Sequence, residues 1–301
     1  MPWMLARSAL AQGSLYSASM KLPLPLAARE MADEFAERLE RVPTHLNEYG
    51  YDQFGMDPSW LRNFGALSVL MYRYYFRVET QGIEKVPEGP VLLIGNHAGN
   101  TLPMDGALLF LAMILEAEPP RIPRAMSEFY LPNIPWWNEM IHRSGAVVGT
   151  PENCKRLLKS GECIMVFPEG SRGFIKPYSK AYQLQRFGRG FARLALETDT
   201  PVVPVGIVGS EEQSPGLLDS KRLASLIGAP SFPITATFPL LGPLGFLPLP
   251  VKYRILFGDP MRLEGDPDDE DEVLQHQVDR VKDQISLLIE EGLEQRTGWF
   301  S

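Results

Sequence analysis

The sequence predicts an α/β protein: a three-layer fold in which a mostly parallel sheet is flanked by helices, with a helical appendage at the N-terminus. From Pro90 onward, short apolar runs such as residues 91–95 and 202–208 alternate with amphipathic segments, which is typical of a parallel sheet with helices on both faces. Of the 301 residues, 45% are hydrophobic, enough to bury a core without disulfide or metal support. We therefore expect an N-terminal helical region, residues 1–85, and one α/β domain, residues 86–301.

Two helices are expected in the N-terminal region. Residues 27–48 have a charged, amphipathic pattern. The second helix has a defined start, because Asp57 suits the N-cap position and Pro58 suits the first helical position. It continues through mostly apolar residues to Phe76, and periodicity alone leaves open whether this segment lies in the core or on the surface.

The α/β domain contains further strands and helices in alternation. Besides the two runs above, the expected strands are residues 121–126, 146–148, 162–167 and 253–257. The expected helices are residues 105–115, a segment opened by Thr150 and closed by Gly161, residues 185–197, and a C-terminal helix with apolar positions at Leu274, Val278, Val281, Ile285 and Leu288.

Charge and cysteine content exclude several classes of protein. The formal net charge of −8 argues against a nucleic-acid binder, whose binding domain would be basic. The two cysteines, Cys154 and Cys163, allow neither a disulfide framework nor a C-x-x-C zinc site. A reducing compartment is therefore expected, with both thiols buried as small apolar groups.

No segment suits a transmembrane helix. The long uncharged run of residues 223–251 carries six prolines, which a membrane-spanning helix does not tolerate. The first 29 residues contain no acid and fit either a transit peptide or a loosely ordered N-terminus.

His97 is the first candidate for chemistry. It directly follows the strand at residues 91–95 and lies between Gly95 and Gly99, and ligands of α/β proteins bind at the carboxyl ends of strands. Asp105 is the first carboxylate after it. A histidine whose tautomer is fixed by a carboxylate is a minimal general base. A histidine that only bonds a loop carbonyl is the alternative.

A second candidate follows the strand at residues 162–167. The loop Pro168-Glu169-Gly170-Ser171-Arg172 places a carboxylate and a guanidinium within one tight turn. Arginine is suited to bind phosphate or carboxylate in a forked geometry. The alternative is a Glu–Arg pair that only holds the loop.

A third feature is a basic run. Between Glu169 and Glu197 there is no acid, and the six cations are Arg172, Lys176, Lys180, Arg186, Arg189 and Arg193. The last three fall on one stripe of the helix expected at residues 185–197. This run is a candidate site for phosphate, coenzyme A or lipid headgroups, and a solvated helix face is the alternative.

Several other chemistries lack their motifs. The sequence contains no G-x-S-x-G elbow, no H-E-x-x-H pair and no Walker A loop, so a lipase-type serine, a zinc protease and a P-loop nucleotide site are unsupported. No metal site is expected.

In these motifs the sequence resembles the lysophospholipid/glycerolipid acyltransferase superfamily (PlsC-like), and is closer to its monoacylglycerol-acyltransferase-like subgroup. The resemblance is carried by Gly95–Gly99 leading to Asp105, and by Val166–Arg172. Residues 145–162 and 201–205 look like the second and fourth motifs of the family, and the match spans roughly residues 80–260.

The resemblance implies transfer of an acyl group from acyl-CoA or acyl-carrier protein, a co-substrate rather than a bound cofactor, to a lipid hydroxyl. His97 would take the acceptor proton, and Asp105 would orient the imidazole. The residues expected to shape the substrate site are Asn96, Gly99, Pro168, Glu169, Gly170, Ser171 and Arg172. A thioester hydrolase with the same pair and a lipid-binding protein without turnover are the alternatives.

One departure from the family concerns spacing. Seven residues separate His97 from Asp105, where four are commonest in the family, so residues 100–103 would have to loop out for the carboxylate to reach the ring. Arg143 lies near the position at which phosphate-binding members carry a motif arginine, and is a further candidate for contact with an acceptor phosphate.

The resemblance also implies contact with a membrane. An N-terminal helical pair often docks on the bilayer in this superfamily, and the helix at residues 57–76 is the candidate. The proline-rich stretch 232–251 is expected either to line an acyl-chain groove or to form buried loops. The protein is thus expected to be peripheral at the cytoplasmic face of a membrane, with an acyl donor, a lipid acceptor and the membrane surface as partners, and no nucleic acid.

Overall fold

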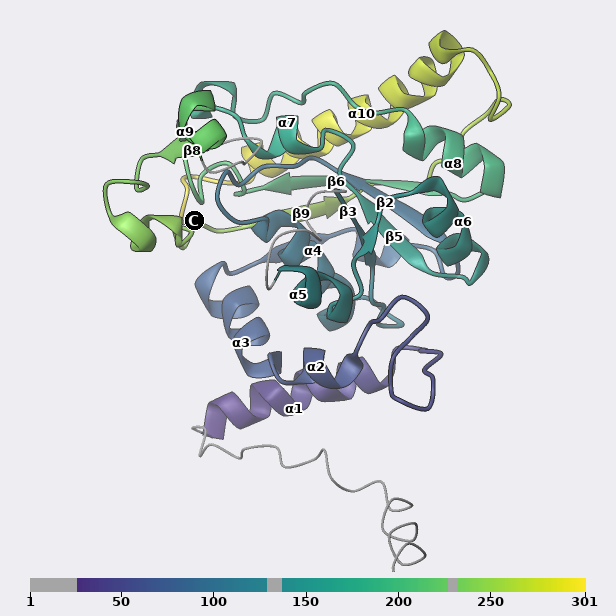
Figure 1. Ribbon diagram of the computed structural model, residues 1–301, viewed down its shortest axis with the longest axis horizontal. Helices are drawn as coiled ribbons and strands as arrows, with labels where there is room; N and C mark the ends of the chain where they lie inside the picture. Colours follow the sequence, from purple (N-terminus) through teal and green to yellow (C-terminus); the bar gives the residue numbers. More distant parts are fainter. Residues whose placement is uncertain (1–25, 129–136, 227–231) are drawn as a thin grey trace, which may run out of the picture.

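A seven-stranded sheet forms the centre of the molecule, for which the computed structural model describes residues 26–128, 137–226 and 232–301 (Figure 1). The strand order is β1-β9-β6-β2-β5-β3-β4. The bounds are β1 Glu79–Gln81, β2 Val91–Gly95, β3 Arg124–Ser127, β4 Val147–Val148, β5 Cys163–Val166, β6 Val202–Val208 and β9 Arg254–Phe257. β2 runs parallel to both β5 and β6, and β9 is antiparallel to β6. The predicted fold class is therefore confirmed.

Helices cover both faces of this sheet, and β2 shows why. Val91 and Leu93 point to one side, into a core shared with α4 (Met104–Leu115) and the N-terminal helices. Leu92 and Ile94 point to the other side, into a core formed with α6 (Pro151–Lys159), α8 (Gly190–Thr198) and α10 (Asp271–Glu294). Alternate residues of a strand face opposite ways, so a continuous apolar run requires a cover on each face.

Local signals set several helix boundaries as predicted. The Asp57 side chain accepts a hydrogen bond from the Trp60 backbone N–H at 3.1 Å, and α2 (Pro58–Arg62) begins there. Thr150 caps α6 through the Asn153 N–H. Cys154 and Cys163 are both buried and free. Burial raises the pKa of Cys154 to about 11 and that of Cys163 to about 12, which keeps both thiols protonated near neutral pH.

The N-terminal helices are shorter than predicted. α1 spans Leu26–Glu40 rather than 27–48, because Pro43 disfavours helical geometry in the residue before it. The second helix is interrupted after α2: α3 spans Gly65–Leu70, and a π-helical turn, η1, spans Met71–Tyr75. At Gly65 a Cβ would lie 3.1 Å from the Phe35 ring. The start of α3 therefore packs closely against Phe35 of α1, with little room for a side chain at this position.

These helices pack on the α/β core and share its hydrophobic cluster. The boundary expected between residues 85 and 86 stays a prediction. Most of the N-terminal segment expected to be a transit peptide or a loosely ordered terminus lies outside the described residues. No helix in the described ranges has the length and apolarity needed to cross a membrane.

A small module is inserted between β6 and β9. It contains β7 (Gly216–Asp219), α9 (Lys221–Leu226), β8 (Pro233–Thr235) and η5 (Gly242–Phe246), with β7 and β8 paired antiparallel. The structure also describes η2 (Ile83–Lys85), α5 (Trp137–Arg143), α7 (Ser171–Phe174) and η4 (Tyr178–Lys180). For residues 232–251, the prediction of buried loops is wrong over much of the stretch, because several of its large apolar side chains are exposed.

The contact between α10 and β6 leaves no room for a side chain at Gly206, where a Cβ would lie 2.6 Å from the Leu288 Cβ and 3.0 Å from the Ile289 backbone nitrogen. Gly206→Ala should therefore lower the free energy of unfolding by about 1–3 kcal/mol through overpacking, as measured by urea denaturation. Gly190→Ala is the matched control, because a Cβ there meets nothing within 4 Å. Equal stability of the two variants would contradict the close packing of α10 on β6.

Candidate active site

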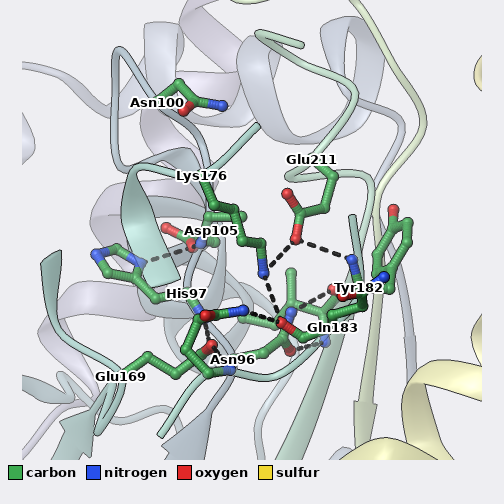
Figure 2. Close-up of polar contacts among 12 residues, drawn as sticks. Asn96, His97, Asn100, Asp105, Glu169, Lys176, Tyr182, Gln183 and Glu211 are labelled. Carbon is green, nitrogen blue, oxygen red and sulfur yellow. Dashed lines mark hydrogen bonds and ion pairs between the residues drawn. The ribbon is translucent and has the colours of Figure 1, made fainter. Parts of the chain in front are cut away.

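Three loops meet at one edge of the sheet. Since β2 lies between β5 and β6 and runs parallel to both, the segments that follow the three strands emerge at the same carboxyl edge. They are the segment from Asn96 after β2, the loop Pro168–Arg172 after β5, and the buried polar run Ser210–Ser214 after β6. Figure 2 shows members of all three groups around His97.

His97 and Asp105 are in direct contact. The His97 Nδ1 lies 2.8 Å from the Asp105 Oδ2. The carboxylate is fully buried in the first turn of α4 and also accepts hydrogen bonds from the backbone N–H groups of Ala98 and Gly106, both at 2.7 Å. These donors compensate the burial of the charge. With the carboxylate as acceptor, Nδ1 is the protonated nitrogen and Nε2 is the one that can accept a proton.

Two phenylalanine rings fix the plane of the imidazole. Phe167 stacks on it with a centroid separation of 4.6 Å, and Phe174 stacks with a separation of 4.9 Å. The His97 side chain retains 16% exposure. The ring is therefore clamped on its faces and at Nδ1, while part of it stays open to solvent.

The seven residues between His97 and Asp105 are held by the segment after β6. Asn100, at φ +55°, donates from Nδ2 to the Ser214 carbonyl at 2.9 Å. Gln213 donates from Nε2 to the Leu102 carbonyl at 2.6 Å, and its Oε1 accepts the Tyr253 hydroxyl hydrogen at 2.6 Å. The spacer loops out as expected, and side chains from outside the spacer fix its course.

Gln213 and Ser214 were not among the predicted site residues. The signal that could have found them is a polar run, Ser-Glu-Glu-Gln-Ser, placed directly after the apolar strand β6. All five residues are buried, and buried polar groups need partners. Such a run at a strand's carboxyl end indicates a hydrogen-bonded scaffold.

Two residues predicted to shape the substrate site, Asn96 and Gly99, have structural contacts at this edge. Asn96 is 2% exposed, and its amide donates to the Ile207 carbonyl and accepts from the Ile207 N–H, so it ties β2 to β6. Gly99 is buried at φ +132°, and a Cβ there would lie 2.5 Å from the Gln213 Nε2. The glycine is required by the spacer's own packing. Contact of either residue with a substrate stays a prediction.

Glu169 supports the backbone of His97. Its Oε1 accepts from the His97 N–H at 3.0 Å, and its Oε2 accepts from the Gln185 N–H at 2.6 Å. The side chain is 1% exposed. The carboxylate thus joins the β5 loop to the residue that carries the imidazole, and its expected role in shaping the acceptor pocket stays a prediction.

The rest of the β5 loop divides into a turn and an exposed end. The Pro168 carbonyl accepts from the Gly188 N–H at 2.9 Å, and Gly170 has φ +58°, a conformation that suits glycine. Ser171 and Arg172 are exposed at the start of α7. Arg172 also lines a hollow of about 300 Å³, together with Lys180 and Lys221.

The basic stripe predicted on the helix at residues 185–197 is wrong. α8 begins only at Gly190, so Arg186 and Arg189 precede it. Arg189 pairs with Asp271 of α10 at 2.5 Å. The charge of this arginine is thus paired with an acid that is distant in the sequence, although the basic run itself contains no acid.

Lys176, a further member of that run, is buried and lies 2.7 Å from the Glu211 Oε1. Burial raises the pKa of Glu211 to about 7, and the nearby ammonium group of Lys176 opposes that rise. The neighbouring Glu212 pairs with Arg296 at 2.7 Å. The buried run after β6 thus carries two ion pairs beside the spacer.

Arg143 has partners away from the His97 loop. It pairs with Glu139 one turn earlier on α5 at 2.8 Å, and lies 4.0 Å from Asp57 at the start of α2. The structure connects this arginine to the N-terminal helices. It provides no support for the expected contact with an acceptor phosphate.

Comparison with known proteins identifies the family of this chain. The family model described as Acyltransferase matches residues 77–208, which include His97, Asp105 and the β5 loop. An uncharacterized protein of Mycobacterium leprae is 40% identical over 82% of this chain and 67% of its own length. The chain belongs to the acyltransferase family.

More distant relatives are named for lipid synthesis. The human "DGAT1/2-independent enzyme synthesizing storage lipids" is 27% identical over 70% of this chain and 60% of that protein. The 1-acyl-sn-glycerophosphate acyltransferase PlsC of Thermotoga maritima is a structural neighbour with a TM-score of 0.47 and 19% identity, covering 87% of this chain and 81% of that chain. The chain spans less than two thirds of some of its more similar relatives: an uncharacterized protein of Mycobacterium tuberculosis is 43% identical over 71% of this chain, and the match covers 60% of that relative's length.

Replacement of the buried Glu169 tests its role as a backbone acceptor. Glu169→Gln places an amide NH₂ against one of the two backbone N–H groups, so one buried donor loses its acceptor and the free energy of unfolding should fall by about 1–3 kcal/mol. Ser171→Ala, at an exposed residue of the same loop, should change it by less than about 0.5 kcal/mol. Urea denaturation measures both, and an unchanged stability of the Gln variant would refute the acceptor role.

The raised pKa of Glu211 predicts a pH dependence of stability. Between the ordinary carboxyl value of 4.5 and about 7, the native state binds more protons at this residue than the unfolded chain does, so its contribution to stability falls as the pH rises through that range. Glu211→Gln, which cannot titrate, should lack this contribution. Urea denaturation at the two ends of the range gives the comparison, and parallel pH profiles for both proteins would contradict it.

Proposed function

We propose that the chain transfers a fatty acyl group from acyl-CoA or acyl-carrier protein to a hydroxyl group of a glycerolipid or lysophospholipid. The observation that carries the proposal is the 2.8 Å contact between the His97 Nδ1 and the buried Asp105. The contact forms despite a spacer longer than the one commonest in the family. Membership of the acyltransferase family supports the reaction class.

The geometry suits general-base catalysis. Nε2 of His97 takes the proton of the acceptor hydroxyl while the oxygen attacks the thioester carbon. The tetrahedral intermediate then collapses, the carbon–sulfur bond breaks, and the thiolate takes the proton from the imidazolium. Asp105 fixes the neutral tautomer and stabilises the imidazolium that forms in between, as the carboxylate of a catalytic triad does. Stacking by Phe167 and Phe174 limits rotation of the ring.

We assign contacts with the substrates to side chains of the site that are exposed to solvent. Arg172 is exposed at the hollow, and we assign it to a phosphate of the donor or the acceptor, since guanidinium binds phosphate in a forked geometry. The donor acts as a co-substrate, and this mechanism uses no other cofactor. Because one substrate is a soluble thioester and the other a lipid, we place the protein peripherally at the cytoplasmic face of a membrane, in phospholipid or storage-lipid synthesis.

Product analysis tests this proposal. The protein is incubated with an acyl-CoA panel and with lysophosphatidate, monoacylglycerol and other lyso-lipids, and products are identified by mass spectrometry. An acylated lipid is the expected product. Free fatty acid without acylated lipid would instead assign a thioester hydrolase with the same His–Asp pair.

Loss of the general base should reduce turnover. His97→Ala is expected to lower kcat/KM for acyl transfer by about 10²–10⁴-fold, and Asp105→Asn should also lower it, because the amide cannot stabilise the imidazolium. His276→Ala, at an exposed residue of α10, is the matched control and should retain the wild-type rate. Full transfer by the His97 variant would rule out this mechanism.

A further inference from the structure

A row of large apolar side chains is exposed on the module between β6 and β9. Leu240, Leu241, Leu244, Phe246 and Leu247 are between 40% and 82% exposed, and we call these five residues the apolar ridge. They lie on η5 and directly beside it. Single exposed leucines are ordinary, but a contiguous exposed apolar patch marks an interaction surface.

The ridge is held in place by its own small core. The Phe238 and Phe246 rings lie 4.0 Å apart, and the Thr237 hydroxyl donates to the Gly245 carbonyl at 3.0 Å. A Cβ at Gly245 would lie 2.6 Å from the Thr237 carbonyl. This segment is therefore packed on one side, and that packing directs the leucines outward.

The module is attached directly to the candidate active site. At Gly216, the first residue of β7, a Cβ would lie 2.6 Å from the Lys176 carbonyl and 3.0 Å from the Asn100 side chain. Ser214 also bonds the His97–Asp105 spacer, through Asn100 and Thr101. Whatever binds the ridge therefore lies beside the edge of the sheet that carries the imidazole.

A second apolar surface lies next to the ridge. The Tyr75 hydroxyl of η1 donates to the Pro248 carbonyl at 2.7 Å, which joins the end of the module to the N-terminal helices. The exposed face of α3 and η1 carries Phe64, Leu67, Leu70 and Tyr74. Figure 1 shows α3 and the green lobe beside α9 and β8 at the same side of the molecule.

The charges around the ridge favour an anionic lipid surface as its partner. No acid occurs between Asp219 and Asp259. Arg222 is exposed on α9, and Arg172 and Lys180 are exposed at the nearby hollow. Asp219 also lines that hollow and pairs with Lys221 at 2.7 Å, so the cations still outnumber the acid there. Apolar side chains with cations at their edge and few acids are the pattern by which proteins dock on anionic bilayers, since the apolar groups enter the acyl boundary and the cations meet phosphate.

We propose that the apolar ridge docks this protein on an anionic lipid bilayer, and that docking brings bilayer lipid to His97. The docking itself is independent of catalysis, while its link to His97 rests on the proposed function. The acyl-chain groove expected at residues 232–251 stays a prediction beside this docking surface.

Vesicle co-sedimentation of the full chain tests the docking. The vesicles contain phosphatidylcholine alone or phosphatidylcholine mixed with phosphatidylglycerol. The triple variant Leu240→Ser, Leu241→Ser, Leu244→Ser should lose about tenfold or more in its partition onto the mixed vesicles, a change of about 1.4 kcal/mol. Leu287→Ser is the matched control, because this residue is 56% exposed on α10, and it should bind as the wild type does. Arg222→Glu should weaken binding to the mixed vesicles alone, and added salt should reduce this difference.

Acyl-transfer assays separate this proposal from the proposed function. With a water-soluble, short-chain acceptor the triple variant should keep the wild-type kcat/KM, whereas with acceptor embedded in vesicles it should lose about tenfold or more. A wild-type chain that binds vesicles but forms no acylated lipid would refute the proposed function and leave the docking intact. The docking would be overturned if the triple variant bound vesicles as well as the wild type does, or if the wild type did not bind vesicles. It would also be overturned if the wild type formed a dimer in solution and the leucine changes dissociated that dimer.

Discussion

The hydrogen bond between the Asp105 carboxylate and His97 is the interaction on which the arrangement at this edge depends. A fully buried carboxylate is costly unless donors surround it, and here the imidazole and two backbone N–H groups supply them. Those donors come from the turn after β2 and from the first turn of α4. The spacer must therefore follow one defined path, and Gln213 and Ser214 fix that path from the next strand along the sheet.

Several motif residues around His97 form hydrogen bonds with backbone groups or leave room for close packing. Glu169 accepts the His97 N–H, Asn96 completes the hydrogen bonding of Ile207 on β6, and Gly99 leaves room for Gln213. Each is buried, so each contributes to catalysis, under the proposed function, by fixing where the imidazole stands. A general base must lie within hydrogen-bond reach of the proton that it takes, and the contacts of these buried residues supply that positioning.

Much of the fold could be predicted from the sequence, because its signals are local. Strands β2 and β6 are continuous apolar runs between turn residues, and Asp57 and Thr150 are helix caps. The direction in which a polar side chain points, and the partner it meets, could not be predicted from neighbouring residues in the sequence. The sequence did not predict the hydrogen bond from Gln185 to Glu169 or the ion pair of Arg189 with Asp271, because the tertiary fold brings these partners together. Gln213 was missed for the same reason, since its partners lie on the spacer and on β9's neighbour Tyr253.

The proline-rich stretch before β9 shows the same limit for apolar residues. Its composition fits buried loops, a groove or an exposed surface equally well, and only the space left by the rest of the fold decides among them. Here both faces of the central sheet are already covered by helices, so the leucines around η5 have no core to enter. An apolar row of this kind lowers solubility when it has no partner. A bilayer can cover it without a matching protein surface, and it also contains the class of acceptor that the proposed reaction uses.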